Sequence, residues 1–457
     1  MKSKVVAPLS VAAAVAVLFF AQVDVVSSQV LPIRAHDPGV RGGTSGAGAP
    51  FTDLTLNEAA FFGAGAVEFG DTESVDDGLG PRMNLDSCGG CHIQPALGGS
   101  SPRVNPQVAF ANQDGGTDQV PSFISANGPV REARFVKNPD GTPDGGVHAL
   151  FTISGRTGAI GCTLAQPDFA TQVANRNVIF RIPTPLFGTG LIEQIPDAAI
   201  VANQGSNLAQ KQALGIGGRP NLILRAITGA TNNNGNDGTI ARFGWKAQNK
   251  SLLLFSGEAY NVEMGITNEL FQTERDESKE CQFVNVPNTV TNTDATTPVE
   301  VLSAIEKFSF FMRFLDAPTP SPDTPGGAVS IANGKQKFSD AGCALCHTPS
   351  FTTAKSMVAA LSEKPVNLYS DLLVHNMGSG LADGVSQGEA GPQEFRSAPL
   401  WGLGQRVFFL HDGRTSDLLQ AILAHAGIGS EANGAILRFL LLRDSDKQDL
   451  LNFLRSL

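Results

Sequence analysis

The chain has 457 residues and a formal net charge of −10, with 33 Lys and Arg against 43 Asp and Glu. This acidic balance argues against nucleic acid as a partner, because binding to a phosphate backbone depends on basic side chains. The 50 glycines and 27 prolines make up about 17% of the chain, against an average of about 12%, so we expect long ordered loops and modest regular structure.

The first 28 residues have the layout of a secretory signal peptide. Two early lysines precede an apolar run from Val5 to Phe20, and Val26-Ser27-Ser28 offers small residues for cleavage. The run is short for a membrane span; an uncleaved anchor is the alternative. We therefore expect a periplasmic or secreted protein with no stable membrane span after cleavage, which begins with a flexible Gly-rich leader over residues 29–51.

The next elements lead to a first cysteine motif. Leu56 to Phe69 is predicted to be a helix, and a Cys-x-x-Cys-His motif follows near residue 90. Residues 102–239 are predicted to form many short strands and turns, because VHALFTISG (147–155) and NVIFRIPTPLF (177–187) have strand composition. ATNNNGNDG (230–238) and residues 285–297 are predicted to be polar loops.

A further helix and a linker follow. The Thr297-Pro298-Val299-Glu300 sequence predicts a helix start with a capping box and Pro at the first helical position. One face of this helix is apolar and carries Ile305, Phe308, Phe311, Met312 and Leu315. DAPTPSPDTPGG (316–327) is a Pro-rich linker that marks a domain boundary.

The C-terminal part repeats the arrangement of the N-terminal part. IANGKQKFSDAGCALCH (331–347) predicts a helix, a tight Gly turn and a second Cys-x-x-Cys-His motif. Ser445-Asp446-Lys447-Gln448 predicts a capping box, and a terminal helix follows with leucines at helical spacing, at positions 450, 451, 454 and 457.

Two motifs hold four of the six cysteines, one with Cys88, Cys91 and His92 and the other with Cys343, Cys346 and His347. Thiols at this spacing can add to the two vinyl groups of haem, and the adjacent imidazole binds the iron as proximal ligand. Zinc would need further ligands nearby, and no second Cys pair lies close to either motif. A disulfide exchanger does not require the histidine. We therefore predict two covalently bound haem c groups.

These elements predict a mainly α fold with two cytochrome c-like domains in tandem. The N-terminal haem c domain is expected over residues 52–315, with a loop- and strand-rich insertion, and the C-terminal domain over residues 328–457. Cys162 and Cys281 remain as a candidate disulfide, with two free thiols as the alternative.

The second axial ligands stay open on the sequence alone. The remaining histidines are His36, His148, His375, His411 and His425, and the methionines considered are Met83, Met264 and Met377. His36 lies in the leader and has no expected role. Each of the others is more often a packed or surface residue than a ligand.

Several longer segments resemble the di-haem oxidoreductase, putative peroxidase family, which is related to bacterial di-haem cytochrome c peroxidases. They include RFGWKAQNKSLLLFSGEAYNVEMGITNELF (242–271), EFRSAPLWGLGQRVFFLHDGRTSDLLQAILAHAG (394–427) and HNMGSGLADG (375–384). The resemblance runs from about residue 52 to residue 457. In those relatives the N-terminal haem reacts with peroxide, and the C-terminal haem accepts electrons.

The resemblance assigns roles to individual residues. By matching motif, Trp245 resembles the tryptophan that assists electron transfer between the haems, and Glu263 resembles the acid/base of the peroxide pocket. His425 stands where relatives have Met or Tyr as sixth ligand, which implies bis-His ligation with His347 and a lower potential than His/Met ligation. Phe255 stands where relatives have glutamine, and no His follows the first motif at short range.

We therefore predict a periplasmic di-haem c-type oxidoreductase of peroxidase type. It would receive electrons from a small periplasmic cytochrome or cupredoxin, and calcium is a further candidate cofactor. The alternatives are a non-catalytic electron-transfer protein and a di-haem oxidase that modifies a protein or small molecule. An open first haem favours an enzyme, and two six-coordinate haems favour a carrier. The sequence leaves the oligomeric state open.

Overall fold

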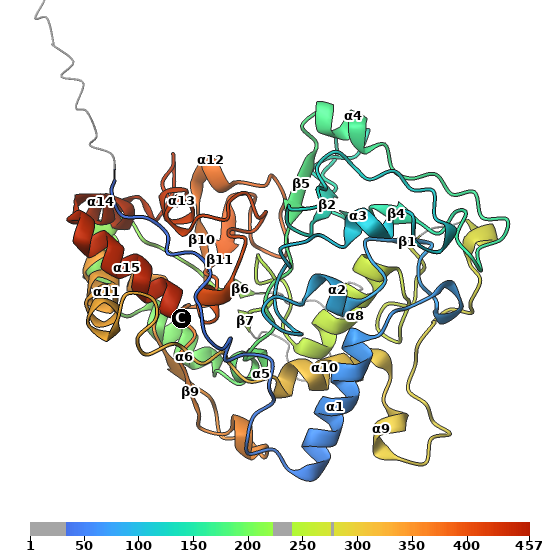
Figure 1. Cartoon of the computed structure of the whole chain (residues 1–457), viewed down its shortest axis with the longest axis horizontal. Helices are drawn as coiled ribbons and strands as arrows, with labels where there is room; N and C mark the ends of the chain where they lie inside the picture. The colour runs from blue at the N-terminus through green and yellow to red at the C-terminus, as the bar shows by residue number, and fades with distance from the viewer. Residues whose placement is uncertain (1–32, 223–239, 276–277) are drawn as a thin grey trace, which may run out of the picture. The chain divides into compact units, whose positions relative to one another are not determined.

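The computed structural model describes residues 33–222, 240–275 and 278–457 (Figure 1). The predicted signal peptide and the loop over residues 230–238 lie outside the described residues. Ala35–Leu457 forms one compact unit. Helices make up 35% of the structure, which is an ordinary share, and the strands are no longer than four residues. Because the sheets are small and their strands short, the fold is mainly α.

The helices are α1 (Leu56–Gly70), α2 (Cys88–Cys91), α3 (Gln107–Phe110), α4 (Phe169–Ala174), α5 (Thr189–Glu193), α6 (Asp197–Gln204), α7 (Leu208–Leu214), α8 (Leu252–Met264), α9 (Pro298–Val301), α10 (Ala304–Phe314), α11 (Ala328–Ala341), α12 (Gly378–Leu381), α13 (Leu418–Leu423), α14 (Asn433–Leu441) and α15 (Asp444–Ser456). The strands are β1 (Arg82–Met83), β2 (Glu132–Phe135), β3 (Val147–His148), β4 (Phe151–Thr152), β5 (Val178–Arg181), β6 (Asn221–Leu222), β7 (Ile240–Ala241), β8 (Phe351–Thr352), β9 (Pro365–Val366), β10 (Val374–Asn376) and β11 (Glu394–Arg396).

All named strands pair antiparallel. The largest sheet has three strands in the order β3-β2-β5, with Ala133 opposite His148 on one side and Phe180 on the other. The other sheets are the pairs β1-β4, β6-β7, β8-β9 and β10-β11. The strands predicted within 147–155 and 177–187 are confirmed as β3, β4 and β5.

Two pairs of closely packed helices flank the two cysteine motifs, α1 with α10 and α11 with α15 (Figure 1). A glycine lies at each crossing. A Cβ atom on Gly65 would stand 2.2 Å from the carbonyl oxygen of Lys307, and one on Gly334 would stand 1.9 Å from that of Asp449. Only glycine permits backbones to approach this closely. The sequence predicted that the elements around the first motif recur around the second, and the packing of the two helix pairs shows this repeat.

The aromatic residue one turn after each glycine extends this repeat. Phe69 lies 5.9 Å from His92, measured between ring centroids, and Phe338 lies 6.3 Å from His347. Each also packs against a phenylalanine of the partner helix in its pair. The helix pairs thus form a wall beside each motif.

Two predicted helices differ from the structure, although Thr297 is confirmed as the N-cap of α9 with Pro298 at its first position. The helix that begins after Thr297 ends at Val301, and α10 starts anew because Ser303 and Glu306 form a second capping box. The terminal helix begins at Asp444, with Arg443 as a cap that makes no side-chain hydrogen bond, so Ser445 lies inside the first turn. The predicted capping box at Ser445 is wrong, because this helix starts one residue before it.

The predicted leader is packed rather than free from Ala35 onward. Asp37 pairs with the buried guanidinium of Arg455, whose Nε lies 2.7 Å from Asp37 Oδ1. The leader backbone also runs antiparallel to the Pro-rich segment, since the amide of Thr319 donates to the carbonyl of Gly46. These contacts hold residues 35–51 against the C-terminal part of the chain.

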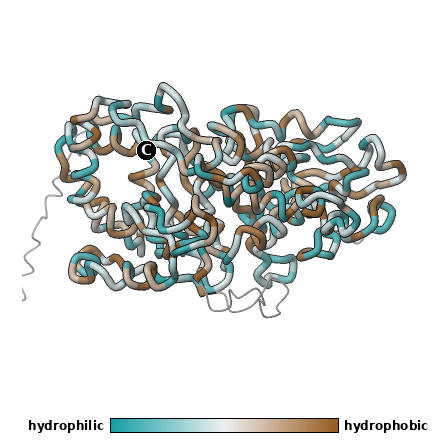
Figure 2. Tube along the Cα trace, turned by 90° about the horizontal axis from the view of Figure 1, so that it is seen from below, coloured by the Kyte–Doolittle hydropathy of each residue, from teal (hydrophilic) through white to brown (hydrophobic). Residues whose placement is uncertain are grey.

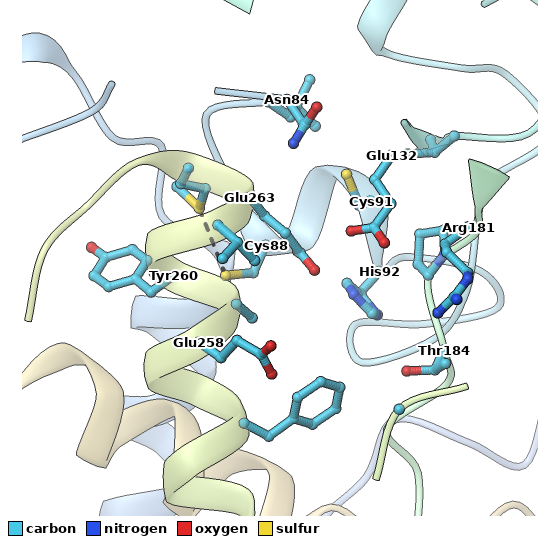
Figure 3. A pocket seen from close by; sticks show the side chains of 18 of the residues that line it. Asn84, Cys88, Cys91, His92, Glu132, Arg181, Thr184, Glu258, Tyr260 and Glu263 are labelled. Atoms are coloured by element: carbon cyan, nitrogen blue, oxygen red, sulfur yellow. Dashed lines mark hydrogen bonds between the residues drawn. The ribbon is translucent and has the colours of Figure 1, made fainter. Parts of the chain in front are cut away.

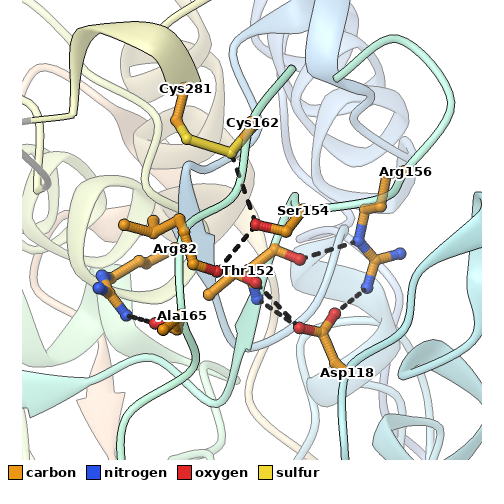
Figure 4. The surroundings of a disulfide bond; sticks show 9 residues. Arg82, Asp118, Thr152, Ser154, Arg156, Cys162, Ala165 and Cys281 are labelled. Atoms are coloured by element: carbon orange, nitrogen blue, oxygen red, sulfur yellow. Dashed lines mark hydrogen bonds and ion pairs between the residues drawn. A yellow bond between two sulfur atoms is a disulfide. The ribbon is translucent and has the colours of Figure 1, made fainter. Parts of the chain in front are cut away.

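The predicted disulfide between Cys162 and Cys281 is confirmed (Figure 4). It joins positions 119 residues apart, and so ties the strand-rich region to the segment after α8. Beside it, a buried ion pair of Arg156 with Asp118 holds the strand-rich region together, since Asp118 also accepts from the amide of Thr152.

Apolar and polar residues are interspersed along the described chain (Figure 2). Accordingly, no helix within the described residues has the length and apolar character needed to cross a membrane.

The glycine contacts predict a matched pair of substitutions on α1. Gly65→Ala should lower the free energy of unfolding by about 1–3 kcal/mol, because the added methyl meets the backbone of α10. Gly63→Ala, on the same helix with open space around its Cα, should instead raise it by up to about 1 kcal/mol through helix propensity. Thermal or denaturant unfolding measures both, and equal effects would contradict the packing described.

Candidate active site

Two large cavities are present, and each has one Cys-x-x-Cys-His motif in its wall. Cavity 1 contains the first motif and about 1150 Å³ of space free of protein atoms, counting its open mouth. Cavity 2 contains the second motif and about 1380 Å³. Both have mostly apolar walls, which suit a large planar cofactor rather than a lone metal ion.

The two motif histidines are held in the same way. Nδ1 of His92 lies 3.0 Å from the carbonyl oxygen of Gly99, and Nδ1 of His347 lies 3.0 Å from that of Tyr369. Burial lowers the pKa of each imidazole to about 4, so both rings are neutral at physiological pH. Since a carbonyl only accepts, the hydrogen is on Nδ1, and Nε2 keeps its lone pair for a metal ion.

Three carboxylates approach the first motif in cavity 1. Glu258 and Glu263 project from α8 toward His92, and Glu132 reaches the same space from β2 (Figure 3). Nε of Arg134 donates to Glu132 at 2.7 Å. An acidic cluster beside a neutral imidazole gives this cavity its own acid–base groups.

The environment of the two α8 carboxylates, Glu258 and Glu263, favours their protonated forms. Burial raises the pKa of Glu263 to about 8, and the charge of Glu132 adds to the shift while Arg134 opposes it. Burial also raises the pKa of Glu258, although Asn249 donates a hydrogen bond to it. A carboxyl group with a pKa near 8 can both give and take a proton at physiological pH.

Cavity 2 has a different character, because a second histidine faces its motif. His425 follows α13 and lines the cavity, with Nδ1 2.8 Å from the carbonyl oxygen of Ala421. Burial lowers the pKa of His425. The closeness of His425 to His347 also helps to lower the pKa of His347. The neutral ring of His425 therefore also keeps Nε2 available for a metal ion.

Two arginines complete the wall of cavity 2. Burial lowers the pKa of Arg396 and of Arg406 to about 10. Among the described residues no carboxylate offsets this burial at either guanidinium. Buried cations of this kind call for an anion, and the carboxylates of a bound cofactor would satisfy them.

His375 lines cavity 2 as well, but both of its ring nitrogens are engaged. Nε2 lies 3.0 Å from Asp371 Oδ2, and Nδ1 lies 2.9 Å from Glu431 Oε2. Although burial opposes it, Asp371 and the neighbouring Cys346 raise the pKa of His375 well above its ordinary value. A doubly paired imidazolium has no free lone pair, so His375 is not available as a metal ligand.

Trp245 stands between the two cavities. Among the described residues that line them, it alone is shared by both walls. Its Nε1 donates to the carbonyl oxygen of Ile182 at 2.9 Å, and its ring meets the edge of His411 with centroids 6.4 Å apart. The indole is thereby held in one orientation, with a face or edge toward each cavity.

A buried charge cluster adjoins this tryptophan. Nζ of Lys246 lies 3.1 Å from Asp383 Oδ1 and donates to the carbonyl oxygens of Gly391 and Glu394. Asp383 also pairs with Arg181 from the wall of cavity 1. Two cations thus share one carboxylate between the cavities, which leaves a net positive charge there.

The structure also shows where the other residues considered in the sequence analysis lie. Phe255 lines cavity 1. An apolar ring therefore stands at the position where the relatives have a glutamine. His148 packs on Phe135 with ring centroids 3.6 Å apart, and its Nε2 lies 2.7 Å from Asp144 Oδ2. It lines neither cavity, so its interpretation as a hydrogen-bonded structural residue fits. His411 lines cavity 2, stacked on Phe395.

The methionines divide between the cavities. Met264 lines cavity 1 with its sulfur 3.9 Å from that of Cys88, Met377 lines cavity 2, and Met83 is buried away from both. No group of three His, Cys, Asp or Glu side chains within the described ranges could hold a metal ion, so no such cluster there suggests the calcium considered above.

Sequence reasoning missed several of these groups. Glu258 lies five positions before Glu263 on one helix, a spacing that turns the two residues about 140° apart, so helical periodicity alone does not place them on one face. Glu132 lies far away in sequence, and nothing in the spacing signals its approach. Arg396 and Arg406 lie in the segment 394–427, which was noted only for its resemblance to the family. Their position in the wall of cavity 2, where they could bind carboxylates, is known only from the structure.

Comparison with known proteins identifies the family to which this chain belongs. The family described as di-haem oxidoreductase, putative peroxidase matches residues 148–457. The chain therefore belongs to this family of oxidoreductases, and its cofactors are haems. The match begins after the first motif, whereas the resemblance was expected from about residue 52. No curated protein matches the chain significantly.

Two solved structures show low overall similarity. One is a MauG-like protein associated with microbial copper homeostasis, with 18% identity, a TM-score of 0.29, and coverage of 61% of this chain and 91% of that chain. The other is the hydrazine synthase of Kuenenia stuttgartiensis, with 17% identity, a TM-score of 0.27, and coverage of 65% and 97%.

Proposed function

We propose that this protein is a di-haem c-type peroxidase of an extracytoplasmic compartment, which reduces peroxide in cavity 1 with electrons received through cavity 2. One observation carries the proposal. Among the residues that the structure describes, Trp245 alone lines both cavities, each cavity has one Cys-x-x-Cys-His motif, and only cavity 1 adds a cluster of carboxylates. A small periplasmic cytochrome or cupredoxin would be the electron donor.

The residues present fit two haems with cytochrome c-like attachment. Cys88 and Cys91 would hold the first haem as thioethers, with His92 as proximal ligand, and Cys343, Cys346 and His347 would hold the second. All four thiols are free and line a cavity. Arg396 and Arg406 would receive carboxylates of the second haem.

Cavity 1 suits peroxide chemistry because its far side offers an acid–base group. When bound, the haem would supply the iron for the reduction of peroxide. Glu263 would accept the proton of the inner peroxide oxygen and return it to the outer oxygen, which leaves as water. Glu258 and Glu132 keep the proton of Glu263 exchangeable by raising its pKa.

The contrast between the cavities supports an enzyme over a pure electron carrier. Of the described residues that line cavity 1, His92 is the only histidine, whereas cavity 2 adds His425 opposite its motif. Cavity 1 would therefore leave a position for substrate beside its haem, whereas His347 and His425 would hold the second haem for electron transfer. The fixed indole of Trp245 would carry electrons from one to the other.

The first expected outcome concerns covalent attachment. Protein exported through a cytochrome c maturation system should have an intact mass two haems above that of the mature polypeptide. Replacing Cys88 and Cys91 by Ala should remove one haem, and replacing Cys343 and Cys346 should remove the other. A mass with one haem or none in the unaltered protein contradicts covalent attachment at both motifs.

The second iron should be low-spin, with His347 and His425 as ligands. His425→Ala should open that iron and shift its electronic spectrum toward high spin. His375→Ala should leave the iron low-spin, because that ring is already paired with two carboxylates. If His375→Ala opens the iron and His425→Ala does not, the ligand assignment is wrong.

The chain has two tryptophans, which makes the electron path testable. Trp245→Phe should slow the oxidation of the second haem after the reduced protein is mixed with peroxide in a stopped-flow instrument, while both resting spectra stay unchanged. Trp401→Phe, whose ring lines neither cavity, is the control and should keep the rate. Equal rates in all three proteins would remove Trp245 from the path.

Glu263→Gln should lower kcat/KM for peroxide by roughly 10²–10⁴-fold, the usual contribution of a positioned acid–base group. The wild-type rate should rise with pH through about 8, because Glu263 accepts a proton only when ionised. This limb should vanish in the variant. Glu300→Gln, at the exposed start of α9, is the matched control. An unchanged rate in Glu263→Gln would rule out this role.

A further inference from the structure

One of the two tyrosines in the chain lies in the wall of cavity 1, on the side away from the carboxylate cluster. Tyr260 is 4% exposed, and its ring extends from α8 in the opposite direction to Glu258 and Glu263 (Figure 3). Its hydroxyl points away from the cavity. The role proposed for cavity 1 uses none of these features.

The hydroxyl of Tyr260 has one strong partner. It donates to Oε1 of Glu73 at 2.6 Å, a short charge-assisted hydrogen bond. Burial raises the pKa of Glu73 to about 7, and Asp77, Glu68 and Asp71 add to the shift while Tyr260 opposes it. Glu73 is half-buried, so it can exchange protons with solvent.

Burial and the Glu73 charge raise the pKa of Tyr260 well above its ordinary value. The phenol therefore does not ionise by itself near neutral pH. It can lose its proton only as it loses an electron, since oxidised phenols are strong acids. A carboxylate 2.6 Å away is placed to take that proton without any movement of the chain.

Aromatic rings connect this tyrosine to the first motif. Tyr260 lies 5.0 Å from Phe308, Phe308 lies 5.9 Å from Phe69, and Phe69 lies 5.9 Å from His92, all measured between ring centroids. The tyrosine and the two phenylalanine rings are buried. They provide a short, dry route for an electron between the tyrosine and the ligand of the first haem.

We propose that Tyr260 is a redox-active tyrosine, with Glu73 as its proton acceptor, that supplies an electron when peroxide reaches cavity 1 before the donor has fully reduced the protein. Reduction of one peroxide to two waters takes two electrons and two protons. Tyr260 supplies one electron, the haem of cavity 1 would supply the other, and both protons come from solvent. The O–H bond of Tyr260 breaks, the proton binds Glu73, and a neutral phenoxyl radical remains. The next electron from the donor restores the phenol, and Glu73 returns the proton. This inference rests on the proposed peroxide chemistry.

The test is rapid freeze-quench electron paramagnetic resonance of the full haem-loaded protein, mixed with hydrogen peroxide in the absence of donor. A tyrosyl radical should form, and its spectrum should narrow when the protein is made with ring-deuterated tyrosine. Tyr260→Phe should abolish the signal. Glu73→Gln, which keeps an acceptor oxygen but is no base, should slow radical formation roughly 10²-fold.

Tyr369→Phe is the control, because it removes the only other tyrosine, and it should leave the radical spectrum unchanged. A tyrosyl signal that persists in Tyr260→Phe, or a rate unaffected by Glu73→Gln, overturns the inference. So does a wild-type protein that consumes peroxide with a donor yet forms no tyrosyl radical.

Peroxide consumption with donor is measured in the same samples, so failure of the proposed function is seen separately. Should no peroxide be consumed, photogenerated tris(bipyridine)ruthenium(III) replaces it as the one-electron oxidant of the same proteins. Oxidation at Tyr260 that slows in Glu73→Gln would still support the relay. Oxidation confined to Tyr369 would overturn it.

Discussion

The close contact of two helix pairs is the constraint on which the rest of this structure depends. At Gly65 and at Gly334 the backbones approach so closely that a Cβ atom would overlap a carbonyl oxygen of the partner helix. Each contact brings a phenylalanine one turn later against the motif histidine, so the helix pair forms one wall of the cavity. The cofactors would supply the remaining apolar core, which explains how a chain so rich in glycine and proline retains two large cavities in a compact unit.

The two cavities share one architecture and differ in their polar groups. Cavity 1 has carboxylates whose pKa values are raised by burial, so it is suited to moving protons. Cavity 2 has a second neutral histidine and two arginines, so it is suited to holding a closed iron and its anionic groups. Between them lie Trp245 and a buried cluster with net positive charge. Such a charge opposes oxidation of the indole, so an oxidised Trp245 would be short-lived in the proposed electron path.

The sequence was most informative where function requires a fixed local pattern. The two haem motifs, the helix from Leu56 and the strands after Val147 follow from spacing and composition, and Trp245 and His425 were located through resemblance. Local capping signals were partly reliable. Thr297 does cap α9, but Ser303 interrupts the helix expected from it, and the terminal helix starts before Ser445. Contacts between distant segments left no trace in the pattern. Glu132 beside Glu263, Glu73 beneath Tyr260 and the packed leader all arise from tertiary structure that single-sequence reasoning does not reach.

The central claim is that the first iron is open to substrate and the second is closed by His425. The electronic and electron paramagnetic resonance spectra of the purified oxidised protein test this most directly, because they report the spin state of each iron. The account predicts one high-spin iron and one low-spin iron with two histidine ligands. Two low-spin irons in both oxidation states would contradict it and would favour an electron carrier.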